Sequence, residues 1–508
     1  MSTRMQSQSK FHHAAWYACV LMAALCCTSA AIGETIIEDT FADGGVTDGA
    51  DPLDVSWTSL SNATTTVVND AVIGDGNALQ ATSTGAFSRV AADVSPITLS
   101  KNREKIKIEF DLHPTVLLNA GDGIRFGLRN SSLNGGGLYD GYYARYDTGT
   151  QDNVDLMADA NTTFGGGTQE SVSTDDNASP LSDTGAHHAV FSVQLTDSGR
   201  VDLRSRMDTH VVSGVHTSGI NTTFNQIGFQ TGGTSGQSFN FDNYRITRWT
   251  NRFDDTFDVG SPATRGNEAA DPNDTQWYRS NTSDVLSVVS DDGAGQIGSN
   301  DALSVDNTGT FRRLITNFNT ASLEQVGHAV ELSFDVRLQA EPTVNTGGAF
   351  RFGLFNSHGT LYNTDADNNM DNDDDGYHVQ LAAGSGSGFL VQEFVGDGSI
   401  LGGGTANQTI DTTSFSLADA LPHYVVLRLT RVLTGMQAEL WVDGELQASG
   451  IDTDGYFTTF NEVAFGTGNL ELDYLLDNVV VDVLIPTPAA LPAGLALLGL
   501  VAARRRIV

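Results

Sequence analysis

The sequence predicts an all-β protein built as an antiparallel β-sandwich, and three observations lead to this fold class. The 508 residues include 54 glycines and only 11 prolines, and polar turn residues separate many short apolar stretches. Apolar and polar residues alternate with the period of two that is typical of half-buried strands. The chain also repeats itself once, at a spacing of about 216 to 236 residues.

Individual strands follow from this alternation. Residues 106–110 and 124–129 alternate apolar side chains with charged residues or glycine. Residues 438–442 do the same, with Trp441 on the polar face, and Asp443-Gly444 then gives a strong hairpin signal. Each strand therefore buries one face. Many such strands, with turns every ~8–12 residues, predict an antiparallel sandwich.

The repeat predicts two copies of one domain, 34–250 and 251–485, with the junction near residues 250–252. A repeat this long is a whole domain rather than a solenoid unit. The spacing grows only in the polar loops, so the strand-like pieces stay in register. The matching segments are Asp39-Thr40-Phe41 with Asp255-Thr256-Phe257, Trp57 with Trp277, Arg125-Phe126-Gly127-Leu128 with Arg351-Phe352-Gly353-Leu354, Asp140-Gly141-Tyr142 with Asp375-Gly376-Tyr377, His188 with His423, and Asp242-Asn243 with Asp477-Asn478.

Residues 1–33 have the features of a secretory signal peptide. Arg4 and Lys10 precede an apolar stretch over residues 14–27, and small residues follow. All three cysteines lie inside this segment, so the mature protein would contain no disulfide and no cysteine metal site. Lipidation is disfavoured, because Leu25 stands where a lipobox needs a small residue before Cys26.

Residues 486–508 form a predicted sorting signal with a hydrophobic helix. The apolar run over residues 489–503 is shorter than the ~20 residues of a comfortable spanning helix. Two prolines precede the run and a cationic cluster follows it: Pro486, Pro488, Arg504, Arg505 and Arg506. This order resembles the PEP-CTERM sorting signal of exopolysaccharide-producing bacteria, with Thr487 where the family usually has glutamate. The resemblance implies processing by a sortase-like membrane protease, an exosortase. An ordinary C-terminal membrane anchor is the alternative.

The mature region is strongly acidic. The two terminal segments hold five of the 27 Lys+Arg residues and none of the 62 Asp+Glu residues, so the remainder carries a charge of about −40. Such a surface repels nucleic acid and anionic polymers and favours divalent cations. With the terminal segments, it predicts an exported protein of the cell envelope, outer surface or extracellular matrix. A C-terminal membrane segment would be present before processing, and nucleic acid is not an expected partner.

Two short motifs resemble those of concanavalin-like, laminin-G-like jelly-roll domains. One is the hairpin at residues 440–445, and the other is the closing strand, residues 241–246 and 476–481 in the two copies. In such domains the last strand returns beside the first, so Phe41 and Phe257 would lie near the closing strands. The resemblance implies two tandem lectin-like jelly-roll domains and a polysaccharide partner.

A candidate sugar-binding groove is predicted on each domain. Arg125 and Arg351 occupy matching places on the polar faces of their strands, and tyrosines follow in both copies. Arginine and aromatic rings suit sugar recognition through hydrogen bonds and stacking. The alternative is a structural ion pair of each arginine with a duplicated acid such as Asp111 or Asp335. The predicted groove residues are Arg125, Tyr142, Tyr143 and Arg145 in the first domain and Arg351, Tyr377 and His378 in the second.

An acidic loop in the second copy is the candidate metal site. Carboxylate and amide oxygens stand at alternate positions and Gly376 follows them, which suits a Ca²⁺ ion. The loop is not a complete EF-hand, because Ala382 stands at position twelve. A solvated acidic insertion is the alternative. The predicted calcium ligands are Asp365, Asp367, Asn369, Asp371, Asp373 and Asp375.

The predicted function is non-catalytic binding of polysaccharide at the cell surface. One alternative is a secreted glycan-cleaving enzyme, because Glu109 and Asp111 stand two apart on one strand and retaining catalysis needs two carboxyls ~5 Å apart. His113 stands where such enzymes place a third acid, which weakens this alternative. A purely structural spacer is the other alternative. Trp57 and Trp277 are predicted to pack in the domain cores or at the sheet edges rather than to bind a ligand.

Overall fold

The structure of the protein, a computed structural model, describes residues 35–484 apart from short gaps. The predicted signal peptide and sorting signal, residues 1–33 and 486–508, lie outside the described residues. In the part of the chain that is described, no helix is long and apolar enough to cross a membrane. The gaps are residues 47–52, 74–75, 120–121, 132–139, 149–153, 161–167, 176–179, 233–235, 258–275, 292–296, 298–300, 341–348, 366–373, 384–387, 394–399, 403–407, 418 and 469–470.

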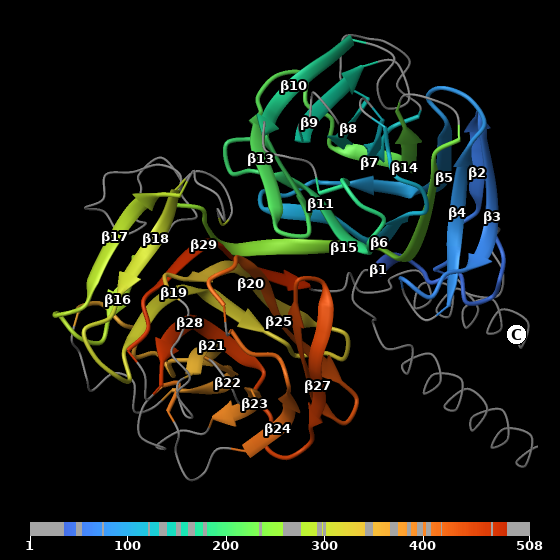
Figure 1. Cartoon of the computed structure of the whole chain (residues 1–508). Helices are drawn as coiled ribbons and strands as arrows, with labels where there is room; N and C mark the ends of the chain where they lie inside the picture. The colour runs from blue at the N-terminus through green and yellow to red at the C-terminus, as the bar shows by residue number, and fades with distance from the viewer. Residues whose placement is uncertain are drawn as a thin grey trace, which may run out of the picture.

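Domain 1 packs two sheets face to face (Figure 1). One sheet has the strand order β10-β9-β8-β7-β14-β5-β2. The other runs β13-β12-β11-β6-β15, with β1 and β4 also beside β15 and with β3 beside β4. The strands are β1 (Thr35–Asp39), β2 (Trp57–Ser61), β3 (Ala63–Asn69), β4 (Asn77–Ser83), β5 (Arg89–Thr98), β6 (Glu104–Pro114), β7 (Gly123–Arg129), β8 (Gly141–Asp147), β9 (Val154–Ala160), β10 (Thr168–Asp175), β11 (His187–Leu195), β12 (Val201–Met207), β13 (His210–His216), β14 (Thr223–Thr231) and β15 (Ser238–Asp255).

Domain 2 repeats this arrangement. One sheet has the order β16-β19-β28-β21-β22-β23-β24, and the other runs β29-β20-β25-β26-β27, with β18 beside β29 and β17 beside β18. The strand ladders of both domains are antiparallel, so the predicted all-β antiparallel fold is confirmed. The strands are β16 (Tyr278–Arg279), β17 (Val285–Ser290), β18 (Asp301–Asp306), β19 (Arg313–Ser322), β20 (Ala329–Leu338), β21 (Ala349–Asn356), β22 (Asp375–Ala382), β23 (Gly388–Glu393), β24 (Gln408–Thr413), β25 (His423–Val432), β26 (Gly435–Val442), β27 (Glu445–Asp452), β28 (Thr459–Thr467) and β29 (Tyr474–Leu484).

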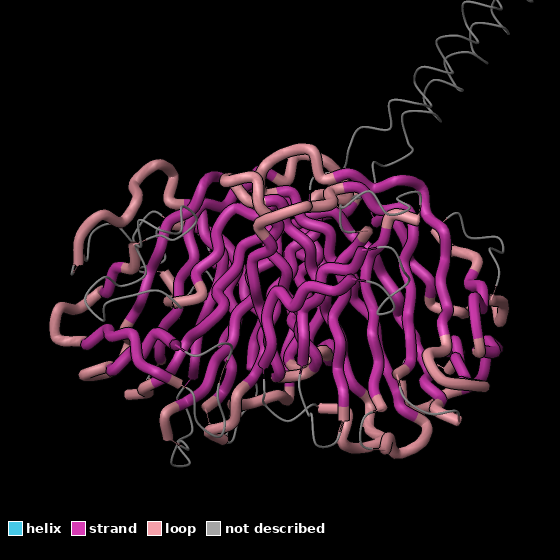
Figure 2. Tube along the Cα trace, turned by 90° about the horizontal axis from the view of Figure 1, so that it is seen from above, coloured by secondary structure: helices cyan, strands magenta, loops and turns pink. Residues whose placement is uncertain are grey.

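One long strand joins the two domains. β15 has 18 residues, and its earlier part pairs with β6 of domain 1, whereas Thr250 to Asp255 pair with β29 of domain 2. The closing strand of domain 1 therefore continues as the opening strand of domain 2. The predicted junction near residues 250–252 lies inside this strand, and a single 15-stranded sheet spans both domains (Figures 1 and 2).

Each domain has its own apolar core between its two sheets. Trp57 and Trp277 are buried in the two cores, as predicted. The indole Nε1 of Trp57 donates to Asp39 at 2.9 Å, and that of Trp277 donates to Asp255 at 2.7 Å. The two copies thus bury the same tryptophan–aspartate hydrogen bond.

The duplication extends to unusual backbone conformations. Phe41 and Phe257 both have φ of 53°, and Asn243 and Asn478 both have φ of 52°. Positive φ is uncommon outside glycine, and it is least unfavourable for asparagine and aspartate. Since these exceptions recur at matching positions, the two domains share the same local geometry in detail.

Candidate binding cleft between the domains

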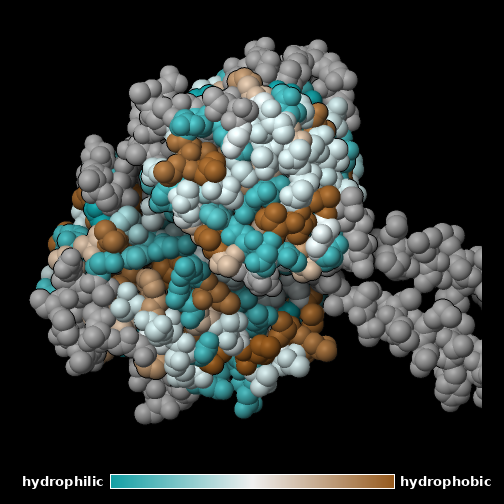
Figure 3. Space-filling view, turned by 45° about the vertical axis from the view of Figure 1, so that its right-hand side comes forward, coloured by the Kyte–Doolittle hydropathy of each residue, from teal (hydrophilic) through white to brown (hydrophobic). Residues whose placement is uncertain are grey.

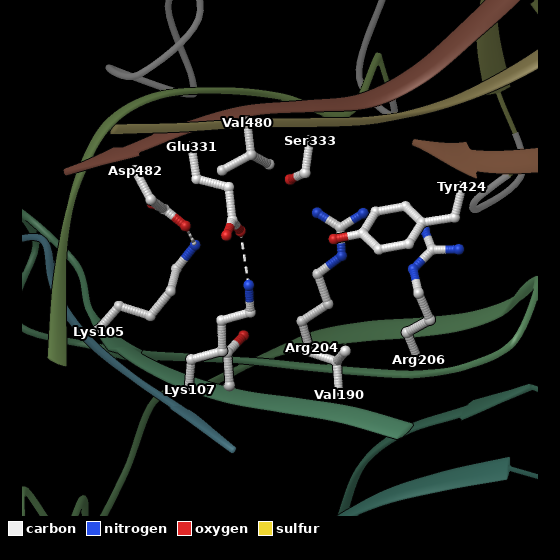
Figure 4. A pocket seen from close by; sticks show the side chains of 11 residues that line it. Lys105, Lys107, Val190, Arg204, Arg206, Glu331, Ser333, Tyr424, Val480 and Asp482 are labelled. Carbon is white, nitrogen blue, oxygen red and sulfur yellow. Dashed lines mark hydrogen bonds and ion pairs between the residues drawn. The ribbon is translucent and has the colours of Figure 1, made fainter. Parts of the chain in front are cut away.

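The outer faces of the two halves of the shared sheet contact each other. Ile106 of β6 points into the core of domain 1, so the neighbouring Lys105 and Lys107 point outward. Lys105 pairs with Asp482 at 2.7 Å and Lys107 pairs with Glu331 at 2.6 Å, both across the domain boundary. Figure 4 shows the two lysines reaching from domain 1 toward these carboxylates. In Figure 3, hydrophilic side chains gather along the boundary between the domains.

Four charged side chains form a buried network at this boundary. Lys107 contacts Glu109 at 2.8 Å and Glu331 at 2.6 Å, and Arg428 contacts Glu331 at 2.6 Å. Burial alone would raise the pKa of both glutamates, but Lys107 and Arg428 outweigh burial and lower it. Burial alone would lower the pKa of the two cations, and the glutamates outweigh it and raise the pKa. The four groups therefore stay charged and compensate one another.

On one side of this network, an arginine fills the space between the domains. Arg206 of β12 donates to Asp335 of β20 at 2.5 Å, and its guanidinium lies 3.8 Å from the ring centroid of Tyr424. Asp335 also accepts a hydrogen bond from Asn478 at 2.7 Å. A cavity of about 40 Å³ remains beside these groups (Figure 4). We call this the closed side.

The strand register corrects one match made from the sequence. His187, and not His188, is the counterpart of His423, because each pairs across its ladder with the residue that follows a matching aspartate. The Nδ1 atom lies 2.7 Å from a hairpin aspartate in both copies, Asp208 and Asp443. His188 therefore corresponds to Tyr424. Two adjacent histidines give the sequence no means of choosing between them.

The same register shows that the two domains meet about a pseudo-two-fold axis. The central lysine–glutamate pair joins matching positions of β6 and β20. Arg206 of β12 and Trp441 of β26 are also counterparts. The contact of Arg206 with Asp335 on the closed side therefore corresponds to the positions of Trp441 and Asp111 on the other side. Such an interface is isologous in the sense used for symmetric dimers.

The other side of the axis is an open cleft of about 310 Å³. Trp441 lines it, and the buried Nε1 of its indole has no hydrogen-bond partner among the described residues. Asp111 lies in the same cleft, accepts a hydrogen bond from Asn243 at 2.7 Å, and lies 2.8 Å from Nδ1 of His188. Domain 1 also contributes Glu38, Glu109 and Arg245 to the lining, and domain 2 contributes Tyr424, Arg428 and Gly444.

We expect His188 in the cleft to titrate above its ordinary pKa of 6.5. Burial alone would lower the pKa of His188, but the hydrogen bond and charge of Asp111, with Glu109 and Asp208, outweigh burial and raise it. Because the folded pKa is raised, the charged histidine stabilises the fold below pH 6.5, and this stabilisation is lost as the pH rises through the raised value.

An NMR titration of the imidazole measures this pKa directly. The variant Asp111→Asn should lower the pKa of His188 and leave that of His423 unchanged, because His423 lies beside Asp443 and Asp419 instead. A wild-type pKa of His188 at or below the ordinary value would contradict the expectation.

The predicted groove residues of domain 1 divide between the core and the outer face of the second sheet. Tyr142 lies in the core, where its hydroxyl accepts from the backbone N–H of Asn221 at 3.0 Å. Arg125, Tyr143 and Arg145 share the opposite face of β7 and β8, because side chains alternate along a strand. Arg145 pairs there with acidic neighbours on β8 and β9. The structure therefore does not bring Tyr142 to the face that carries the arginines.

Domain 2 divides its predicted groove residues in the same way. Tyr377 lies in the core, and its hydroxyl donates to Asp452 at 2.8 Å. Arg351 lies on the outer face and donates to the carbonyl of Leu401 at 2.6 Å, and His378 is buried beside it on β22. An apolar cluster that includes Leu401 packs over this face.

Asp111 and Asp335 are not the partners of these arginines. Asp111 lies on β6 beside His188, and Asp335 lies on β20 beside Arg206. The arginines lie on β7 and β21, which belong to the opposite sheets. Outward-facing residues of two stacked sheets are separated by the thickness of the sandwich, so they cannot pair.

The acidic loop of domain 2 is described only at its two ends. Asp365 pairs with Arg279 at 3.0 Å, and Asp375 lies 2.8 Å from Nε2 of His358. Within the described ranges, no group of three or more His, Cys, Asp or Glu side chains is arranged to hold a metal ion. The other predicted ligands lie outside those ranges: Asp367, Asn369, Asp371 and Asp373.

The sequence predicted no site at the domain boundary, although one signal was available. Trp441 stands on the polar face of an alternating strand, and a large aromatic side chain that faces outward needs something to cover it. Glu109 and Asp111, considered as a catalytic pair, both line the cleft. The residues of domain 2 that face Glu109 and Asp111 depend on how the two domains dock. The periodicity of the strands carries no information about that docking.

Comparison with known proteins gives only likenesses of structure. No family model matches the chain, and no curated protein matches its sequence. Among solved structures, the chain is similar to the globular domain of calreticulin from T. cruzi, with 13% identity over 48% of this chain and 91% of that chain and a TM-score of 0.32. It is also similar to the CBM22-1-CBM22-2 tandem domain of Xyn10C from Paenibacillus barcinonensis, with 11% identity over 89% of this chain and 99% of that chain and a TM-score of 0.22. A third likeness is to lectin I-B4 from Griffonia simplicifolia, with 14% identity over 42% of this chain and 99% of that chain and a TM-score of 0.28. At such low identity and TM-score, these likenesses carry no argument about what this chain binds.

Proposed function

We propose that this protein is exported to the cell surface or extracellular matrix and binds a polysaccharide there without cleaving it. The proposed binding site is the open cleft between the two domains. The predicted jelly-roll domains would serve as the two rigid halves of that site, because they are joined through one continuous sheet. Tyrosine and tryptophan side chains line the cleft together with carboxylates, as is typical of sites for polar small molecules.

One observation carries this proposal. Trp441 has a buried indole N–H without a partner among the described residues, and Asp111 offers a carboxylate in the same cleft. On the closed side, their counterparts Arg206 and Asp335 bond directly to each other. A hydroxyl group both donates and accepts, so a sugar hydroxyl can bridge a donor and an acceptor that do not meet. The indole ring adds an apolar surface for the C–H face of the sugar.

The two ends of the chain carry the proposed export and sorting signals. The signal peptide over residues 1–33 would direct export, and residues 486–508 would direct sorting by an exosortase-like protease. An intact-mass measurement of the secreted protein tests this, since a processed chain should end near Pro488. Calcium at the acidic loop of domain 2 also remains a prediction, and calorimetric titration of the full chain with Ca²⁺ tests it.

Replacing Trp441 by alanine should weaken polysaccharide binding about tenfold or more, which corresponds to ~1.4 kcal/mol. The loss is expected because the variant removes both the ring surface and the N–H donor. A glycan array identifies the ligand, and calorimetry then measures its affinity.

The matched control for this variant is Phe389→Ala. Phe389 is an aromatic residue on β23, in the other sheet of domain 2, and is 39% exposed. Its loss should leave the affinity unchanged. Equal affinities of the wild type and of Trp441→Ala for the glycan would show that the cleft is not the binding site.

The glycan-cleaving alternative is disfavoured by the charges around Glu109. A glycosidase needs one carboxyl that keeps its proton near neutral pH, and such groups have a raised pKa. Burial alone would raise the pKa of Glu109, but Lys107 and Arg428 outweigh it and lower the pKa. Turnover of a glycan that is abolished by Glu109→Gln or Asp111→Asn would establish the enzyme instead. An absence of heat with any glycan would favour the structural spacer.

A further inference from the structure

We infer that the open cleft takes a neutral hexose unit of the polysaccharide, one per chain, in preference to an acidic or a basic sugar. The inference rests on the proposed function and deepens it by naming the class of sugar. It follows from how the charges in the cleft are already compensated, and from the difference between the two sides of the pseudo-two-fold axis.

The charged side chains along the cleft already have opposite charges beside them. Glu109 contacts Lys107 at 2.8 Å and lies 3.6 Å from Arg428. Glu38 of β1 lies directly across the strand ladder from Arg245 of β15. With His188 charged, the lining of the cleft holds as many cationic side chains as carboxylates, so a sugar carboxylate or ammonium would lose its own hydration without meeting an excess of the opposite charge.

Asp111 and its counterpart Asp335 differ in how their charge is compensated. On the closed side, the residue across the ladder from Asp335 is Tyr424, which carries no charge. Asp335 accepts a hydrogen bond from the guanidinium of Arg206 in the other domain. On the open side, His188 stands at the tyrosine position and lies 2.8 Å from Asp111 within the same domain. The aspartate of the closed side thus pairs with a cation from the other domain, whereas the aspartate of the open side lies beside His188 of its own domain.

The remaining groups of the cleft suit hydroxyls. Asp111 retains acceptor capacity after its contacts with His188 and Asn243, since an ionised carboxylate has about four lone-pair sites. The indole N–H of Trp441 supplies a donor. Acidic polymers meet a further barrier at longer range, because the whole chain carries a formal charge of −35.

The volumes of the two sides set the stoichiometry. The open cleft of about 310 Å³ lies at the lower end of the ~300–1000 Å³ that is usual for small-molecule sites, so it suits a short stretch of a glycan chain. On the closed side, Arg206 occupies the corresponding space and leaves about 40 Å³. We therefore expect one ligand per chain although the domain is duplicated.

The test compares three sets of hexasaccharides on the full mature chain by calorimetry. The neutral set contains glucose, galactose or mannose units, the acidic set contains uronates, and the basic set contains glucosamine. We expect a neutral oligosaccharide to bind at one site per chain, and the charged sets to bind about tenfold more weakly or not at all. A preference for uronate or glucosamine would overturn the inference and leave the proposed function standing. Binding to none of the three sets would overturn both.

The variant His188→Gln provides a second readout. Glutamine keeps a hydrogen-bond donor beside Asp111 but removes the positive charge, so the open side would then resemble the closed side. We expect the affinity for glucosamine hexasaccharide to rise about tenfold relative to the affinity for the neutral hexasaccharide. A thermal unfolding midpoint close to that of the wild type shows that the variant is folded. If glucosamine binding does not rise in the folded variant, His188 does not set the charge preference and the inference fails.

Discussion

Replacing Glu331 by glutamine is expected to lower the free energy of unfolding by about 3 kcal/mol, because it removes one partner from a buried ion network. Glu331 is 2% exposed. Its carboxylate accepts hydrogen bonds from Lys107 of domain 1 and from Arg428 of domain 2, each at 2.6 Å. Glutamine has nearly the same shape but no charge. The two buried cations would then share the single carboxylate of Glu109. Denaturant unfolding of the full chain measures the change.

The matched control is Asp197→Asn, which breaks an exposed ion pair of domain 1. Asp197 lies 2.8 Å from Arg103, and its side chain is 34% exposed, so its loss should cost less than ~1 kcal/mol. Equal losses for the two variants at neutral pH would show that the network does not stabilise the domain interface.

The pH dependence of the Glu331 effect has a definite sign. Burial is outweighed by Lys107 and Arg428, so the pKa of Glu331 is lowered in the folded protein. Its contribution is therefore present above the ordinary value of 4.5 and is lost as the pH falls through the lowered value. The difference between the wild type and Glu331→Gln should shrink accordingly in acid. A difference that grows below pH 4.5 would contradict this assignment.

Replacing Gly444 by alanine is expected to cost about 3 kcal/mol and to impair binding in the cleft. Gly444 stands in the turn between β26 and β27 with φ of +84°, where an alanine is strained by ~1 kcal/mol. An added Cβ would lie 2.5 Å from Cβ and 2.6 Å from Cγ of His188 in the other domain. These atoms lie close to the backbone and cannot turn away, so the overlap should add about 2 kcal/mol.

The matched control for this variant is Gly199→Ala. Gly199 also has positive φ, +72°, but an added Cβ would meet nothing within 4 Å. It should therefore show the backbone strain alone and leave glycan affinity unchanged. Unfolding measurements and calorimetry on both variants separate the two contributions. If the two alanines cost the same, the close contact between the turn and His188 is not a determinant of the domain docking.

The parts of the fold that were predicted correctly depend on local interactions. Residues 106–110 and 438–442 lie in β6 and β26, where alternation places apolar side chains in the cores. The hairpin signal at Asp443-Gly444 is confirmed, since both residues have the positive φ that a type I′ turn requires. Each of these features is encoded within a few residues of where it appears.

The predicted grooves show where local reasoning stops. Tyr142 and Tyr143 are adjacent, and alternation cannot decide which of two similar side chains points inward. A shift of one residue moves a strand's entire set of side chains to the other face. The structure places Tyr142 of β8 in the core with Phe126 and Leu128 of β7. Arg145 of β8 lies on the opposite face. The sequence could therefore name the strands of the predicted grooves but not the composition of their faces.

By itself the sequence determined the all-β class, the duplication and the acidic charge, because each of these is encoded in composition or in periodicity. The two terminal signals, which rest on short motifs, stay predictions. Only the tertiary structure decided that one strand joins the two domains, and that their charged outer faces close on each other around Lys107 and Glu331. These two residues are 224 positions apart in the chain. At the open cleft, Trp441 stands where the closed side has Arg206, and His188 stands where the closed side has Tyr424. Trp441 on the polar face of its strand indicates that something covers it, but the residues it meets depend on how the domains dock, which no local pattern reports.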